Sequence, residues 1–131
     1  AQGSLIDVAP TVLDLFGLPI PPAMTGVSLI EQSKKSYTPV KRLLFLILDG
    51  WGLCENTKGN LITCAETPVM DKLLTSYPSA QLAASGVDVG LPPKTVGNSE
   101  AGHLHIGAGR IIYSDRLRID ESIAKAKGGA A

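Results

Sequence analysis

The chain has 131 residues, 44 % of them apolar, which suits about one domain with a core of its own. Twelve basic residues balance twelve acidic ones, so charge gives no reason to expect nucleic acid or an anionic membrane as partner. The longest run of large apolar residues, 43–48, is far shorter than the ~20 residues of a membrane-spanning helix. The N-terminus does not resemble a signal peptide, and the two cysteines match neither a zinc nor a disulfide pattern, so we expect a cytoplasmic protein with reduced thiols.

The first predicted element is a short helix over residues 7–17, DVAPTVLDLFG. Pro10 suits its first turn, where a missing N–H breaks no hydrogen bond, and Gly17 suits the position after its last turn. Three prolines in residues 18–26 then predict an extended surface loop. Residues 31–41 are polar and without periodicity, which predicts a linker.

An unbroken apolar run, LLFLIL at residues 43–48, comes next and ends on Asp49 and Gly50. Because it lacks polar alternation, it predicts a strand buried on both faces of a parallel sheet. Asp49 would stand at the carboxyl end of that strand, the edge at which open α/β sheets bind ligands. A carboxylate so placed is typical of a ligand for a hard cation; the alternative is an aspartate that caps the following turn.

A second helix is predicted over residues 67–77, with Thr67 as its N-cap and Pro68 at its first position. Residues 80–85 predict a short strand, and residues 86–97, rich in glycine and proline, predict a loop. The core-facing stripe of the helix is predicted from spacing i, i+3, i+4, i+7: Met70, Leu73, Leu74 and Tyr77.

The stretch TVGNSEAGHLHIGAG, residues 95–109, carries polar and small residues of little use in a core. Gly97 permits a sharp turn, and Asn98 can cap the element after it. If a helix begins at Ser99, its free N–H groups favour an anion beside the hydroxyl. Such a serine can accept a phosphoryl group, particularly beside a divalent cation, which lowers the pKa of a hydroxyl. The alternative is an ordinary capping serine.

His103 and His105 allow two geometries that exclude each other. On a helix, His103 shares a face with Ser99 and can form a serine–histidine pair. On a strand, the two rings share a face, as in some metal sites. A hydrogen-bonding role without chemistry is the third interpretation, and it is the one we favour for both.

Residues 110–126 start apolar and end with a helical pattern. Their three arginines can clamp a phosphate or pair with neighbouring carboxylates. We expect the pairing. The residues concerned are Arg110, Arg116 and Arg118 on one side and Asp115, Asp120 and Glu121 on the other.

Taken together, several segments resemble one family. LLFLILDGWG, ETPVMDKLLTSYP and VGNSEAGHLHIGAGRII resemble, in order and spacing, the N-terminal part of the 2,3-bisphosphoglycerate-independent phosphoglycerate mutases of the alkaline-phosphatase-like superfamily. The resemblance runs from residue 42 to residue 124, whereas residues 3–30 resemble the extreme C-terminus of the family, so the order is permuted here. It implies an α/β fold: a partial alkaline-phosphatase-like domain with a mainly parallel sheet flanked by helices, in which residues 1–30 and 42–131 form one incomplete unit.

The resemblance also implies chemistry for two residues. Asp49 would ligate one of the two manganese ions of the family, and Ser99 would be both the nucleophile and a ligand of the same ion. The reaction implied is the glycolytic interconversion of 3-phosphoglycerate and 2-phosphoglycerate through a phosphoserine intermediate.

The remaining metal ligands of the family, two aspartates and three histidines, lie in a stretch that has no counterpart here, as does its substrate-binding domain. We do not assign His103 or His105 to that set. We therefore expect the isolated chain to be inactive and a complementary chain to carry the missing domain. Two alternatives are a non-catalytic structural or interaction module and another metal-dependent phosphatase or phosphomutase of the superfamily.

Overall fold

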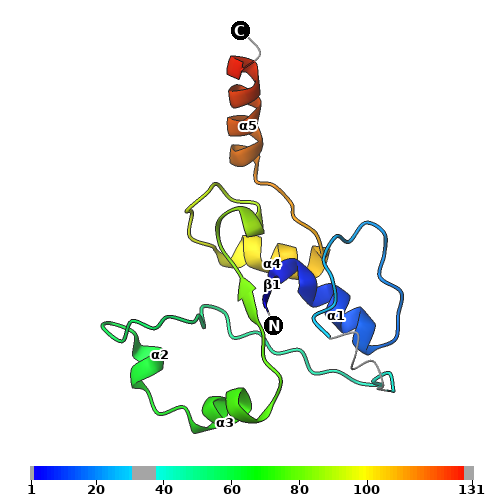
Figure 1. Cartoon of the computed structure of the whole chain (residues 1–131), viewed down its shortest axis with the longest axis vertical. Coiled ribbons are helices and arrows are strands. Elements are labelled where there is room, and N and C mark those ends of the chain that lie inside the picture. Colours follow the sequence, from blue (N-terminus) through cyan, green and yellow to red (C-terminus); the bar gives the residue numbers. More distant parts are fainter. Residues whose placement is uncertain (1, 31–37, 129–131) are drawn as a thin grey trace.

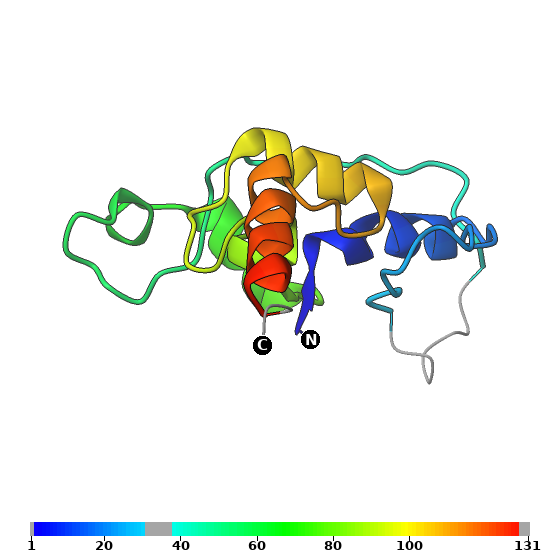
Figure 2. The same ribbon diagram turned by 90° about the horizontal axis from the view of Figure 1, so that it is seen from above.

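The computed structural model describes residues 2–30 and 38–128, and it has a partial α/β architecture with several helices and a small parallel sheet of two strands. Strand β1 (Gln2–Ser4) pairs in parallel with β2 (Gln81–Ala83), with Gln2 opposite Gln81. Both Figure 1 and Figure 2 show α1 (Val8–Leu15) beside α4 (Ser99–Ala108). The predicted fold class is confirmed. Most of the predicted linker, residues 31–37, lies outside the described residues.

The predicted helices are present, with ends where the capping residues placed them. Helix α1 follows the short 3₁₀ helix η1 (Leu5–Asp7), and Gly17 takes the left-handed conformation at φ +67°. Helix α3 (Pro68–Ser76) has Thr67 as N-cap. The other elements are α2 (Leu61–Cys64), the 3₁₀ helix η3 (Gly86–Val89) and α5 (Asp115–Gly128).

The predicted buried strand over residues 43–48 is wrong. This segment belongs to no strand, and its side chains are exposed, Leu44 to 88 %. A central strand needs a ladder partner on each side, and the sheet among the described residues is only β1 and β2. The apolar run therefore has the composition of a buried strand without the neighbours that would bury it.

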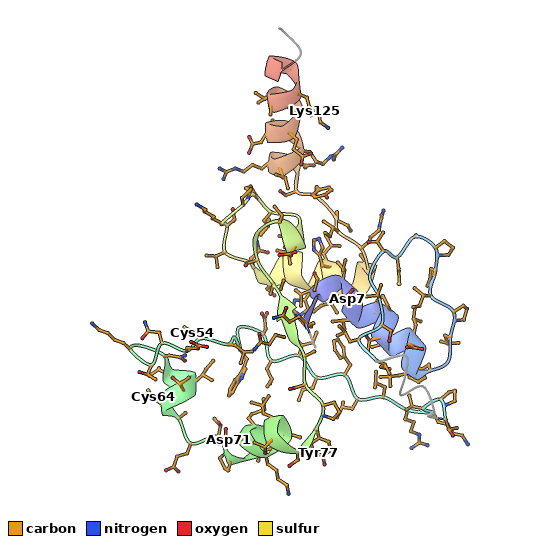
Figure 3. The ribbon with its side chains drawn as sticks, in the orientation of Figure 1. Asp7, Cys54, Cys64, Asp71, Tyr77 and Lys125 are labelled. Atoms are coloured by element: carbon orange, nitrogen blue, oxygen red, sulfur yellow. The ribbon has the colours of Figure 1, made fainter. Side chains whose placement is uncertain are left out.

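The predicted core-facing stripe of α3 is also wrong, because its apolar side chains are not covered by neighbouring elements. Leu73, Leu74 and Tyr77 are exposed, although the helix itself forms. Proline at the first position and the contact from Thr67 Oγ1 to Asp71 Oδ1, 3.0 Å, fix the start of the helix locally. Figure 3 shows Asp71 on α3 and Tyr77 just after it, below the body formed by α1 and α4. Cys54 lies on the outer loop and Cys64 at the end of α2, and both thiols are free and exposed.

The buried carboxylate of Asp7 joins the N-terminal elements. Its Oδ2 accepts a hydrogen bond from Ser4 N, and its Oδ1 accepts one from Val27 N, each at 2.8 Å. Its backbone carbonyl accepts from Thr11 Oγ1, whose oxygen accepts in turn from Leu29 N. Asp7 therefore ties together the end of β1, the start of α1 and the segment that follows the proline-rich loop, at the centre of the molecule in Figure 3.

Helix α4 is fastened to this N-terminal unit at its C-terminal end. The carbonyl of Gly109 accepts hydrogen bonds from Thr25 N and Gly26 N, both at 2.9 Å. Gly109 has φ +62°, and the side chain of Met24 lies 2.7 Å from where a Cβ would be, so only glycine fits there. Two segments far apart in sequence, residues 2–30 and α4, thus pack as one unit.

Helix α5 projects away from the body of the molecule in Figure 1. Among the described residues, no helix combines the length and the apolar character needed to cross a bilayer.

Replacing Asp7 tests its role as the junction. We expect Asp7→Ala to lower the free energy of unfolding by roughly 2–4 kcal/mol, because two backbone N–H donors lose a charged acceptor. Asp7→Asn, which keeps one acceptor oxygen, should lose less. Urea unfolding followed by circular dichroism measures both, with Glu66→Ala on the exposed surface as control. A change below about 0.5 kcal/mol for Asp7→Ala, the size expected for an ordinary surface site, would contradict this role.

Candidate functional site

Ser99 is the first residue of α4, so the helical one of the two geometries considered for this stretch is the one present. Asn98 before it is extended (φ −140°, ψ 165°), and its Oδ1 accepts a hydrogen bond from Ala101 N at 2.8 Å. Its carbonyl accepts the first bond of the helix, from Gly102 N, at 2.9 Å. The asparagine side chain thus caps the helix, which leaves the Ser99 hydroxyl for other partners.

Gly97 places this helix start against the sheet. A Cβ at Gly97 would collide with the carbonyl oxygen of Ala84, the residue that follows β2. Glycine is therefore required here for close backbone approach rather than for the sharp turn that its position had indicated. The approach brings the N-terminus of α4 to the carboxyl end of a parallel strand.

Asp49 reaches Ser99 from a separate segment. It sits in a turn closed by a hydrogen bond from Trp51 N to Leu48 O, 3.1 Å, with Gly50 at φ +80°. Ser99 Oγ donates to Asp49 Oδ2 at 2.7 Å, and both side chains are exposed. The structure therefore brings together the two residues singled out from the sequence, although the strand expected to carry Asp49 is absent.

The two histidines lie on the helix, so the strand geometry that would pair them as metal ligands is wrong. His103 is exposed, with Nδ1 2.8 Å from Ser99 O and 3.2 Å from Ser99 Oγ. His105 is buried, with Nδ1 2.6 Å from Ala101 O, and its Nε2 accepts from Ile112 N at 3.0 Å. Both ring nitrogens of His105 are thus engaged within the fold, which is the structural role favoured for it.

The oxygen pair at Asp49 and Ser99 fits part of a divalent-cation site. Two oxygens that share one small octahedral cation at ~2.1 Å lie roughly 3 Å apart, and carboxylate and hydroxyl oxygens are suitable hard donors. The observed separation is 2.7 Å. Among residues 2–30 and 38–128, no group of three or more histidine, cysteine, aspartate or glutamate side chains comes together as a metal site. The pair therefore supplies one edge of a coordination sphere and no more.

Two of the three arginines pair with carboxylates, as expected. Arg118 Nη1 lies 3.3 Å from Asp115 Oδ1, and Arg116 Nε lies 3.9 Å from Asp120 Oδ2. Each pair lies on the surface of α5, where such contacts stabilise little.

A hollow of about 310 Å³ lies beside α4, but neither Ser99 nor Asp49 lines it. Its wall is mainly apolar and includes Val89, Leu104 and Ile112. We give more weight to the exposed oxygen pair, because there a serine hydroxyl and a carboxylate from separate segments lie within 2.7 Å of each other.

The chain is similar to known proteins over about two thirds of its length. The family model described as the metalloenzyme superfamily matches residues 41–128. The chain is similar to proteins named 2,3-bisphosphoglycerate-independent phosphoglycerate mutase: 58 % identical over 84 residues to that of Gracilaria tenuistipitata, 51 % over 85 residues to that of Trichormus variabilis and 52 % over 82 residues to that of Shewanella frigidimarina.

These alignments cover 63–65 % of the chain but only 16 % of each relative. The chain thus spans about a sixth of the length of these curated relatives. No solved structure matches it significantly.

Proposed function

The chain belongs to the metalloenzyme superfamily, and from that premise we propose that it is the nucleophile-bearing part of a cofactor-independent phosphoglycerate mutase. The reaction would interconvert 3-phosphoglycerate and 2-phosphoglycerate through a phosphoserine at Ser99. The observation that carries the proposal is the 2.7 Å contact between Ser99 Oγ and Asp49 Oδ2 at the start of α4. The names of the matched relatives favour a mutase over another phosphatase of the superfamily.

Ser99 would act as the nucleophile. Its Oγ would attack the phosphorus of phosphoglycerate, forming an Oγ–P bond as the bond from phosphorus to the substrate oxygen breaks. The hydroxyl proton, directed at Asp49 Oδ2 in the structure, would be transferred to the departing glycerate oxygen. The phosphoryl group would then return to the neighbouring hydroxyl of the glycerate. Asp49 orients the serine by accepting a hydrogen bond from its hydroxyl. The positive N-terminal end of the α4 dipole favours the negative phosphoryl group.

Asp49 and Ser99 would hold a divalent cation, Mn²⁺ in our proposal, at a partial site. A cation there would supply positive charge to the nucleophilic oxygen and to the phosphoryl group. Two protein ligands are too few for a tight site, since catalytic metal centres use three or more with oriented neighbours. We therefore expect weak metal binding and negligible turnover in the isolated chain.

The remaining ligands and the substrate-binding groups would come from a complementary chain, with phosphoglycerate as the small-molecule substrate. The exposed apolar run 43–48 supports this, because a complementary chain could cover its uncovered apolar side chains. Residues 1–30 and 42–131 would form one domain. The β1–β2 pairing and the bonds to Gly109 O support that proposal.

The direct test of function is a phosphoryl trap. The chain is combined with Mn²⁺, 3-phosphoglycerate and the remaining part of the Gracilaria relative, and peptide mass spectrometry then locates added phosphate. We expect label on Ser99 in the wild type and none in Ser99→Ala. In Asp49→Asn we expect roughly 10- to 100-fold less label, the loss of activity typical of changes around a metal site. Glu66→Gln, an exposed carboxylate away from the site, serves as the matched control. No label on Ser99 in the assembled system would contradict the nucleophile assignment.

A second candidate, an interaction module without chemistry, is favoured by the same exposed run. If it is correct, residues 43–48 should drive self-association of the isolated chain through unpaired backbone groups. Light scattering after size exclusion should then show oligomers that Leu44→Lys and Leu46→Lys together reduce to monomer. Leu61→Lys, at an equally exposed position on α2, should change nothing. A stable monomer at high concentration would count against this candidate.

A further inference from the structure

The ring of His103 makes two contacts with Ser99, both through one nitrogen. Nδ1 lies 2.8 Å from the Ser99 carbonyl oxygen and 3.2 Å from Ser99 Oγ. A backbone carbonyl has no hydrogen to give, so a hydrogen bond at that distance requires the hydrogen to be on Nδ1. The same hydrogen also points toward Oγ, as the longer arm of a three-centre bond.

This geometry determines which way the serine hydroxyl faces. Nδ1 has no lone pair left to accept, so the hydroxyl proton goes to Asp49 Oδ2, 2.7 Å away. One lone pair of Oγ then accepts from His103, and the second lone pair makes neither of these two contacts. His103 Nδ1 therefore cannot act as the general base for Ser99, the role that the i, i+4 spacing had allowed.

We propose that His103 is a positioning residue for Ser99, acting as a hydrogen-bond donor through Nδ1 and not as its base. This inference rests on the proposed function, in which Ser99 Oγ attacks phosphorus. A donor fixed beside Oγ holds one side-chain rotamer. It also stabilises the oxygen when the Oγ–P bond breaks and negative charge returns to it, because hydrogen bonds to charged oxygens are about twice as strong as neutral ones.

His105 provides a comparison within the same helix. Its Nδ1 also faces a carbonyl one turn back, Ala101 O, at 2.6 Å, but its Nε2 accepts from Ile112 N inside the fold. Both contacts of His105 are to backbone groups of the buried structure. His103 alone directs its Nδ1–H at a side chain with a nucleophilic oxygen.

The first test is the tautomer of His103 in the full ¹⁵N-labelled chain. Long-range proton–nitrogen correlation spectra distinguish the two ring nitrogens. We expect the hydrogen on Nδ1 in His103 and in His105, which acts as an internal reference. A hydrogen on Nε2 of His103, with Nδ1 unprotonated, would overturn the proposal.

The second test compares two amide variants. In His103→Asn the side-chain amide nitrogen falls near the position of Nδ1, whereas in His103→Gln it falls near that of Nε2. We expect proton–proton couplings to show one dominant Ser99 rotamer in the wild type and in His103→Asn, and averaging over several rotamers in His103→Gln. Averaging in His103→Asn, or one retained rotamer in His103→Gln, would overturn the proposal.

Thermal unfolding of both variants separates positioning from a merely structural role. Glutamine is the better helix former, so a structural role would favour His103→Gln, the reverse of the order expected for the Ser99 rotamer. Neither test needs turnover. Failure of the phosphoryl trap with the Nδ1 tautomer present would therefore reject the proposed function and leave the positioning result standing.

Discussion

The hydrogen bond from Ser99 Oγ to Asp49 Oδ2 joins two residues fifty positions apart, and the chemistry that we assign to this chain depends on it. Each partner is placed by local structure. Asn98 caps α4 so that Ser99 is its first residue, and the turn after Leu48 presents Asp49. Between them the two side chains combine a nucleophilic oxygen with a hard metal-ligand oxygen, and the first turn of a helix lies behind the nucleophile.

The scaffold behind this contact is small. Asp7 connects β1 and α1 to the segment after the proline-rich loop, and the carbonyl of Gly109 connects α4 to the end of that loop. Among the described residues, Val89 and Leu117 are the only large apolar side chains that are buried, whereas Leu44, Leu46 and many others are exposed. So much uncovered apolar surface agrees with a chain that spans about a sixth of its relatives.

Local signals predicted the helices well. Pro10 with Gly17, Thr67 with Pro68, and Asn98 with Ser99 each marked a helix end, because capping is satisfied by residues a few positions apart. The strand at 43–48 and the buried stripe of α3 could not be settled in this way, since burial depends on what lies next to a segment in space. The role of Asp7 was missed, although the spacing Ser4–x–x–Asp7 resembles a capping box and signals such a carboxylate. For the site, the sequence identified Asp49 and Ser99 as candidate residues. The role of His103 as a hydrogen-bond donor could not be read from the sequence, because it depends on the two contacts of Nδ1.

The central claim is that the oxygens of Asp49 and Ser99 share one cation, and Mn²⁺ binding measures it most directly. Electron paramagnetic resonance of free Mn²⁺ gives the affinity of the isolated chain and of Asp49→Asn, Ser99→Ala and the control Glu66→Gln. The account predicts weak binding in the wild type and the control, and an affinity lower by about tenfold or more in the other two variants. Equal affinity in all four proteins would contradict it.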